Sequence, residues 1–263
     1  RIVGDYDIDG VCSTYILLQA FERLGSDVDF EIPDRIKDGY GINESIIEQA
    51  HADGVEVILT CDNGISAFHQ VELAKKYGMT VVITDHHEVP LDGEKEKIPP
   101  ADAVIDPKQA DCPYPFPEIC GAVVAYKLVQ VLYARRGVPQ MEWLDLLEFA
   151  AIATVGDVMK LQDENRILVK YGLKKMAQTK NLGLRRLAEK NNLDLGAITA
   201  YHIGFVIGPC LNAGGRLKTA KEALALLRAQ SEEEAERLAE ELKELNDTRK
   251  DMTEQGTEAA KLQ

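Results

Sequence analysis

Residues 55–87 read VEVILTCDNGISAFHQVELAKKYGMTVVITDHH, and this stretch decides the fold. Two runs rich in β-branched residues, Val55-Thr60 and Met79-Thr84, enclose a segment, Ile65-Tyr77, whose apolar residues recur at helical spacing. The same alternation surrounds it, with expected strands at 2–3, 28–32 and 101–105 and expected helices at 11–24 and 42–50. A strand–helix–strand rhythm of this kind predicts an α/β fold, in which helices flank a parallel sheet on both faces.

The second half of the chain has a different pattern. From Gly121 onward the apolar residues follow helical spacing almost throughout, over 122–136, 141–155, 166–179, 184–191 and 221–229. Ser231 and Glu234 form a capping-box pattern that opens an apolar stripe, which predicts a long helix that either leaves the domain or packs on it. We therefore expect three parts: a sheet part at 1–120, a helical part at 121–230 and a long connecting helix at 231–263.

Composition narrows the class of protein. The 263 residues are 45% hydrophobic, enough for a substantial core, and no apolar run approaches the ~18 residues that span a membrane. Five scattered cysteines fit neither a disulfide framework nor a zinc knuckle, and they predict a reducing cytoplasm. The net charge of −14 argues against a general nucleic-acid coat but allows a local basic groove. Because the chain begins without Met, we expect a piece of a longer protein.

Acidic and histidine side chains follow four of the five expected strands, those at 2–3, 55–60, 79–84 and 101–105. The set is Asp5, Asp7, Asp9, Asp62, Asp85, His86, His87 and Asp106. The carboxyl ends of parallel strands share one edge of a sheet, where ligands bind, so these groups are expected to converge. If strand geometry persisted, the spacing of two would aim Asp5, Asp7 and Asp9 the same way. Taken alone, Asp62-Asn63-Gly64 could equally be a turn or a helix cap.

Several carboxylates in one crevice require a positive counter-charge. Carboxylate oxygens with one or two imidazole nitrogens suit Mn²⁺, Mg²⁺ or Zn²⁺, and several carboxylates without a thiolate favour Mn²⁺ over structural zinc. Two such ions can activate water for attack on phosphorus. Asp157 ends a nearly uncharged stretch and could reach the same ions. The residues thus predict a two-metal phosphoesterase. A dinucleotide-binding protein is disfavoured, because Asp5 and Asp7 stand where a pyrophosphate needs bare glycine amides.

With these residues in place, the sequence resembles the DHH phosphoesterase family, and within it the RecJ-type single-strand exonucleases. The shared motifs, in the family's order, are Gly4-Asp5-Tyr6-Asp7-Ile8-Asp9-Gly10, Pro33-Asp34-Arg35-Ile36-Lys37-Asp38-Gly39-Tyr40-Gly41, Cys61-Asp62-Asn63-Gly64-Ile65-Ser66, Asp85-His86-His87, Thr154-Val155-Gly156-Asp157 and Gly208-Pro209-Cys210-Leu211-Asn212-Ala213-Gly214-Gly215-Arg216-Leu217. The likeness covers essentially the whole chain.

The resemblance implies a role for each motif residue. The implied metal ligands are Asp7, Asp9, Asp62, His86 and Asp157, with Asp62 as the bridge; Asp5 supports them and Asp85 orients its motif. The implied substrate contacts are His87, Asn212, Gly214, Gly215 and Arg216. Arg35 and Arg216 lie in expected motif loops and could line the approach to the ions, while Tyr40 could stack on a base or pin its loop.

The implied activity is 5′→3′ hydrolysis of single-stranded DNA to mononucleotides. The implied cofactor is a pair of Mn²⁺ or Mg²⁺ ions, and partners would be a DNA 5′ end and a single-strand-binding protein or recombination helicase, with no membrane. Cys210 and Gly214 depart from the usual RecJ-type residues, and nothing matches the family's second, DHH-associated domain. Two alternatives stay open: a family member acting on short oligonucleotides, 3′-phosphoadenosine 5′-phosphate or cyclic dinucleotides, and a non-catalytic replication scaffold.

Overall fold

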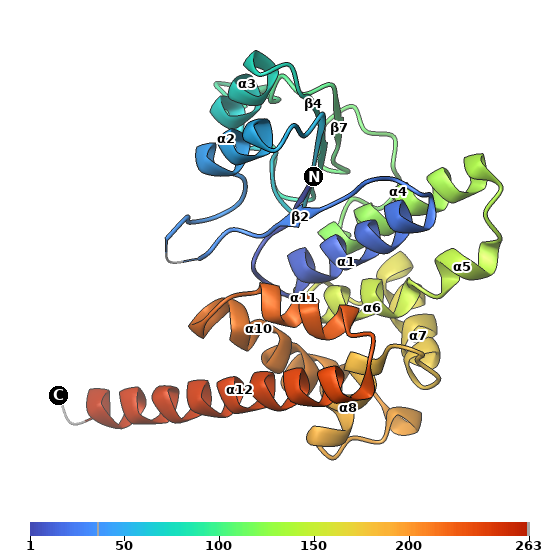
Figure 1. Ribbon diagram of the computed structural model, residues 1–263, viewed down its shortest axis with the longest axis vertical. Coiled ribbons are helices and arrows are strands. Elements are labelled where there is room, and N and C mark those ends of the chain that lie inside the picture. The colour runs from blue at the N-terminus through green and yellow to red at the C-terminus, as the bar shows by residue number, and fades with distance from the viewer. Residues whose placement is uncertain (36, 262–263) are drawn as a thin grey trace.

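A five-stranded parallel sheet forms the upper half of the molecule in Figure 1. The computed structural model describes residues 1–35 and 37–261. The strands run in the order β2-β1-β3-β4-β7, with bounds Phe30–Glu31, Ile2–Val3, Val57–Cys61, Thr80–Thr84 and Ala103–Ile105. All four pairings are parallel, which confirms the predicted α/β class. The 28–32 strand is shorter than expected, and Ile36 lies outside the described residues.

Helices cover both faces of the sheet. Helices α1 (Ile8–Arg23) and α4 (Gly121–Arg136) share a hydrophobic core with one face, and α2 (Glu44–Ala52) and α3 (Phe68–Lys76) share a second core with the other. Apolar side chains at helical spacing, such as Val71 and Ala74 on α3, are fully buried against the sheet. A small antiparallel hairpin, β5 (Leu91–Asp92) and β6 (Lys95–Glu96), was not expected from the sequence.

The second half is helical, as expected, with two differences. Its elements are α5 (Gln140–Leu144), α6 (Leu147–Gly156), α7 (Asp163–Met176), α8 (Leu182–Lys190), α9 (Ala200–His202), a π-helical turn (Ile203–Ile207), α10 (Gly208–Leu217) and α11 (Lys221–Arg228). The expected helix at 141–155 breaks at Asp145 and Leu146. The Arg216 motif, expected in a loop, forms helix α10, so that expectation was wrong.

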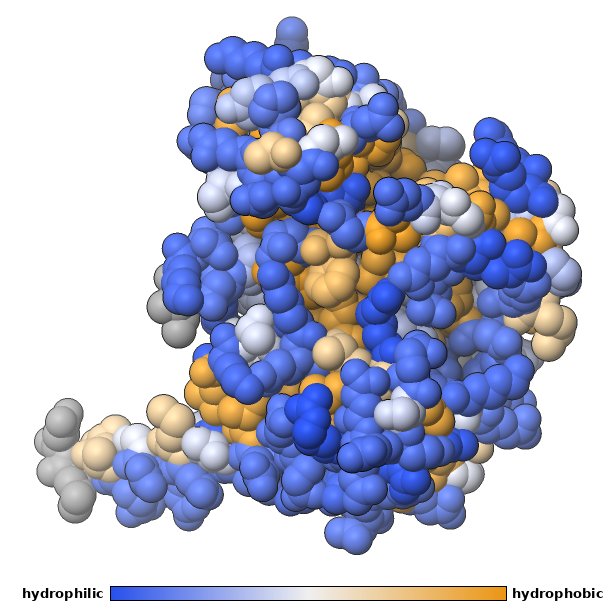
Figure 2. Space-filling model, in the orientation of Figure 1, coloured by the Kyte–Doolittle hydropathy of each residue, from blue (hydrophilic) through white to orange (hydrophobic). Residues whose placement is uncertain are grey.

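Helix α12 (Glu232–Lys261) combines both of the arrangements left open by the sequence. Its first half packs against α8, α10 and α11, where Leu238, Leu242 and Asn246 are buried. Its last part, 250–261, is exposed and projects from the body (Figure 1). Figure 2 shows mostly hydrophilic residues, with smaller hydrophobic patches, over the lower part of the molecule around α8 and α12. Among the described helices, none is both long and apolar enough to cross a membrane.

Candidate metal centre

The acidic cluster lies at the point where the order of the strands in the sheet reverses. Strand β1 lies between β2 and β3, and the chain continues from it first to β2 on one side and then to β3 on the other. This switch in strand order opens a crevice at the carboxyl ends of the strands. Asp5, Asp62, Asp85 and His86 follow β1, β3 and β4 at this edge, and all four are buried. The structure therefore brings together groups up to 81 positions apart in the sequence, between Asp5 and His86.

Asp7 and Asp9 reach the crevice through a helix rather than a strand. The strand ends at Val3 and α1 begins at Ile8, so the expected period of two does not extend to Asp9. Asp7 caps α1, because its Oδ1 accepts from the amides of Asp9 and Gly10 at 2.9 and 3.1 Å. Asp9 is fully buried, and its two oxygens accept from the first amides of α4, those of Gly121 and Ala122, at 2.6 and 2.7 Å. Positive helix ends thus partly balance both carboxylates.

Asp62 is held in an unusual backbone conformation. Its φ of 62° lies in the left-handed region, which costs free energy for any residue other than glycine. Gly121 faces it so closely that a Cβ there would lie 2.7 Å from the Asp62 Cβ. Burial and the charges of Asp9 and Asp7 raise the pKa of Asp62 well above its usual range. A buried carboxyl with a raised pKa is a group whose ionised form needs a cation.

His86 faces three carboxylates. Its Nε2 lies 3.0 Å from Asp62 Oδ1, 3.4 Å from Asp9 Oδ2 and 3.8 Å from Asp157 Oδ2. Burial lowers the pKa of His86, which favours the neutral imidazole that metals bind. The buried His86 Nδ1 and Asp62 Oδ1 have no hydrogen-bond partner among the described residues.

His87 has a separate environment on the same edge. Its Nδ1 lies 2.7 Å from Asp85 Oδ1, and this hydrogen bond raises the pKa of His87. Burial opposes ionisation of Asp85, but hydrogen bonds from His87 and from the Ile65 and His86 amides lower its pKa overall. The Tyr40 hydroxyl donates to the Asp62 carbonyl at 3.0 Å and contacts the His87 ring nitrogens at 3.2 Å. Tyr40 therefore pins its loop to the cluster, one of its two expected roles.

Three overlapping groups of side chains have donor atoms within 4.8 Å of one another. The groups are Asp62 with His86 and His87, Asp9 with His86 and Asp157, and Asp5 with Asp7 and Asp62. Asp62 and His86 each belong to two groups, so neighbouring sites would share them. Burial and nearby carboxylates raise the pKa values of Asp5 and Asp157 to about 7. Oxygen-rich donors with neutral imidazole, and an unpartnered Oδ1 on buried Asp5, fit divalent cations.

A cavity of about 290 Å³ adjoins the cluster. It is lined by Asp5, Tyr6, Asp7, Ile8, Arg35, Tyr40, Gly156, Asn212, Gly215 and Arg216. The Asn212 amide oxygen accepts from the Ile8 amide at 2.7 Å, which leaves its Nδ2 as a donor. The Arg35 guanidinium lies 5.2 Å above the Tyr6 ring. The cavity thus combines carboxylates on one side with cationic and amide donors on the other.

Several expected residues have other surroundings than the sequence suggested. Gly214 is buried outside this cavity, because a Cβ there would lie 2.7 Å from the Thr219 carbonyl oxygen and 3.4 Å from Leu242. At Gly215 a Cβ would lie 2.2 Å from the Tyr6 carbonyl oxygen. Both glycines therefore let α10 pack against the protein's own chain, and of the two only Gly215 lines the cavity. Asp106 is buried but belongs to none of the three groups.

Asn63 is a site residue that sequence reasoning passed over. Its Nδ2 donates to the carbonyls of Val3 and Cys61, both at 3.0 Å, and its Oδ1 accepts from the Ile42 amide at 3.2 Å. One side chain therefore joins the ends of β1 and β3 to the segment before α2. The sequence shows that Asn63 directly follows Asp62, but it does not show which backbone groups Asn63 contacts.

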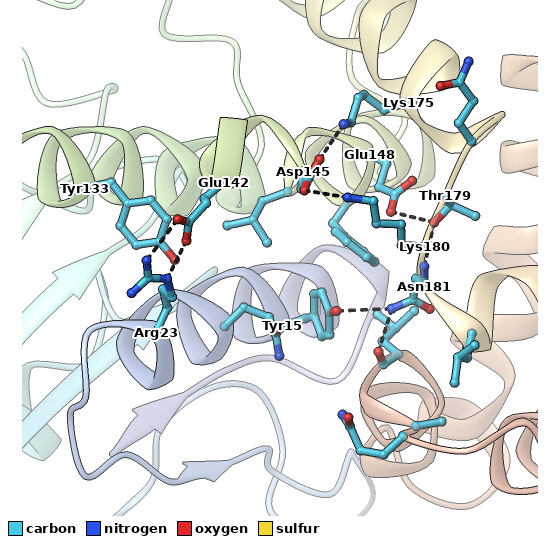
Figure 3. Close-up of a pocket in the computed structure, with 18 residues that line it drawn as sticks. Tyr15, Arg23, Tyr133, Glu142, Asp145, Glu148, Lys175, Thr179, Lys180 and Asn181 are labelled. Carbon is cyan, nitrogen blue, oxygen red and sulfur yellow. Dashed lines mark hydrogen bonds and ion pairs between the residues drawn. The ribbon is translucent and has the colours of Figure 1, made fainter. Parts of the chain in front are cut away.

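A second cavity, of about 500 Å³, lies between α1, α5–α6 and residues 175–182 (Figure 3). Ion pairs cross it, Arg23 with Glu142 and Lys175 with Asp145. Glu148 is buried there and accepts from the Thr179 hydroxyl at 2.7 Å. None of the three metal-competent groups found among the described residues lies in this cavity, which separates it from the candidate centre.

Comparison with known proteins gives consistent matches. Residues 1–154 match the model of the DHH family, N-terminal domain. The single-stranded-DNA-specific exonuclease RecJ of Bacillus subtilis (strain 168) is 40% identical over 259 residues, which are 98% of this chain and 32% of that protein. RecJ of Escherichia coli (strain K12) is 38% identical over 99% of this chain and 46% of that protein. The chain therefore spans about a third to a half of these relatives.

Solved structures give the same result. A crystal structure of exonuclease RecJ bound to manganese matches with a TM-score of 0.86 and 35% identity, over 97% of this chain and 62% of that one. RecJ from Thermus thermophilus in complex with Mn²⁺ matches with a TM-score of 0.81 and 33% identity, over 97% of this chain and 36% of that one. Sequence motifs, family model and fold agree, and this chain belongs to the DHH family, with RecJ exonucleases among its relatives.

Proposed function

We propose that this chain is the catalytic part of a metal-dependent phosphodiesterase that degrades single-stranded DNA from a 5′ end to mononucleotides. The observation that carries the proposal is the set of overlapping carboxylate–histidine groups, in which the buried Asp5 Oδ1 and Asp62 Oδ1 have no hydrogen-bond partner among the described residues. Its relatives are named single-stranded-DNA-specific exonucleases, and two matched structures contain manganese. The polarity, the cytoplasmic location, and a single-strand-binding protein or recombination helicase as partner follow from the family resemblance.

The proposed ligands are Asp7, Asp9, Asp62, His86 and Asp157, with Asp62 shared and Asp5 in support. When bound, two Mn²⁺ or Mg²⁺ ions supply the positive charge that activates water and stabilises the transition state at phosphorus. The protein's part is to hold the donors. Helix N-termini fix Asp7 and Asp9, and the left-handed backbone at Asp62 aims its carboxylate into the crevice.

The remaining site residues are proposed to bind the phosphate. The hydrogen bond with Asp85 raises the pKa of His87 and so favours the imidazolium form, in which both ring nitrogens are donors and Nε2 can donate to a phosphate oxygen. Arg35, Arg216 and Asn212 line the adjoining cavity. The two guanidinium groups and the Asn212 Nδ2 can donate hydrogen bonds to further oxygens of a bound phosphate. The three parts 1–120, 121–230 and 231–263 are proposed as sheet unit, helical unit and connecting helix, since the cluster draws ligands from the first two.

The test is degradation of end-labelled, 5′-phosphorylated single-stranded DNA with Mn²⁺, Mg²⁺ or EDTA, beside a 3′-phosphorylated strand and a dinucleotide. The variant Asp62→Ala should abolish metal-dependent release of 5′ nucleotides. The matched control Asp27→Asn removes an exposed carboxylate elsewhere and should leave the rate unchanged. Hydrolysis of the dinucleotide alone would indicate the small-substrate branch of the family. No turnover of either substrate, even in a chain of the relatives' full length, would indicate a scaffold.

A further inference from the structure

Two aromatic side chains on the segment that leads into α10 are exposed to solvent and lie outside the hydrophobic core. Tyr201 and Phe205 are 64% and 68% exposed, and their rings stack with centroids 4.8 Å apart at 27°. They lie on α9 and the π-helical turn, whose Ile203 and Ile207 are fully buried in the core. A π-helical turn costs stability and often marks a functional site. Here Phe205 points outward while Ile203 and Ile207 stay buried.

The aromatic pair adjoins the Asp157 end of α6. Gly204 packs so closely that a Cβ there would lie 3.6 Å from Val155 Cγ1, two residues before Asp157. The turn runs directly into α10, which carries Asn212 and Arg216 into the adjoining cavity. The exposed rings therefore lie on the segment that leads directly into the helix of the proposed phosphate-binding surface.

A cation from α12 lies near Arg216 on α10. Helices α10 and α12 pack with opposed residue order, since Gly214 faces Leu242 and Cys210 Sγ lies 3.6 Å from the Asn246 Nδ2. One further turn along α12 reaches Arg249, and one turn back from Cys210 reaches the aromatic segment. Buried Asn246 holds Arg249, because its Oδ1 accepts from the Arg249 Nε at 3.1 Å. Arg249 and Arg35 also lower the pKa of Arg216, after the effect of burial.

These arginines are available for an anion. Across the described part of the chain, no carboxylate lies in an ion pair with Arg35, Arg216 or Arg249, although the protein carries a net charge of −14. Asp5 and Asp7 line the same cavity as Arg35 and Arg216, but a guanidinium outside an ion pair can still bind a phosphate of a strand. Exposed rings next to cations are the combination by which proteins bind single strands, with bases stacked and phosphates paired.

We propose that Tyr201 and Phe205 form a base-stacking platform, and Arg249 a phosphate contact, for the nucleotides that follow the strand end held at the Asp/His cluster. The proposal rests on the proposed function and extends it along the strand. It assigns Arg249, from the connecting helix, to the substrate track.

The test is equilibrium binding of a labelled 20-nucleotide oligothymidylate in EDTA, where hydrolysis is stopped. The double variant with Tyr201→Leu and Phe205→Leu keeps apolar side chains but removes the rings, and should bind about 5- to 30-fold more weakly. An abasic strand should bind the unmodified protein and the double variant equally. Arg249→Gln should reduce the slope of log affinity against log salt by about 0.7. The control Tyr171→Leu, also exposed and on α7, should change nothing.

Hydrolysis of a dinucleotide in the presence of Mn²⁺ separates the proposed function from the proposed platform. A dinucleotide can occupy the Asp/His cluster but is too short to reach the platform as well. If the unmodified protein hydrolyses neither it nor the long strand, the proposed function fails. Normal dinucleotide turnover by the double variant, together with undiminished affinity for the long strand, would overturn the platform instead. The platform would also be overturned if the double variant lost as much affinity for the abasic strand as for the oligothymidylate, because the rings would then act through protein packing and not through the bases. Melting curves of both variants should match that of the unmodified protein.

Discussion

The sharpest stability prediction concerns Glu148, in the cavity away from the candidate centre (Figure 3). Its Oε1 accepts from the Thr179 hydroxyl, while its buried Oε2 has no hydrogen-bond partner among the described residues. Burial raises the pKa of Glu148 from 4.5 to about 7, although the Thr179 hydrogen bond and the charge of Lys175 oppose the rise. The folded chain therefore keeps the carboxyl protonated over a pH range in which the unfolded chain ionises it.

The sign follows from this difference. Below pH 4.5 the carboxyl is protonated in both states and costs nothing. Between pH 4.5 and 7 the unfolded chain binds fewer protons, so the stability falls as the pH rises, and above about pH 7 the loss is constant. At about 1.4 kcal/mol for each pH unit, the loss amounts to about 3 kcal/mol. Glu148→Gln keeps the acceptor for Thr179 and cannot ionise, so it removes this loss.

The assay is urea unfolding followed by far-UV circular dichroism in EDTA, at intervals from pH 4.5 to 8, for the unmodified protein and Glu148→Gln. Titration of the Asp cluster is common to both proteins and cancels in the difference. The variant should match the unmodified protein near pH 4.5 and exceed it by about 3 kcal/mol at pH 8. A difference independent of pH over this range would refute the reasoning, and so would a variant that is less stable at pH 8.

The other predictions concern the candidate centre and the long helix. Asp62→Asn should raise stability in EDTA by roughly 1–3 kcal/mol, because the amide cannot ionise in the unfolded chain as the carboxyl does, and it should abolish the rise in melting temperature that Mn²⁺ gives the unmodified protein. Gly121→Ala places a Cβ 2.7 Å from the Asp62 Cβ; a loss of about 1–3 kcal/mol and a weaker Mn²⁺-induced melting shift are expected in calorimetry. Gly256→Ala meets open space on exposed α12 and should raise helicity, measured by circular dichroism, with a gain of up to about 1 kcal/mol; a loss would show that α12 is not helical there.

The sequence alone determined the sheet and the identity of the clustered groups. Strands with β-branched runs and helices with apolar stripes have different periods, so the alternation at 55–87 specifies an α/β unit without tertiary information. Parallel strands then force Asp5, Asp62 and His86 to one edge, because all of their carboxyl ends point the same way. That inference needs only the strand order along the chain.

Only the tertiary structure decided how these groups are held and what lies beside them. The amides that Asp9 accepts from belong to a helix 112 positions away, and the approach of Gly121 to Asp62 depends on how that helix packs. Helix formation by the glycine-rich segment 208–217 ran against local propensity, because packing on Tyr6, Thr219 and Leu242 favours small residues there. The approach of Arg249 to Arg216 arises from the crossing of α10 and α12. Such contacts depend on distances between elements, which no local pattern of residues encodes.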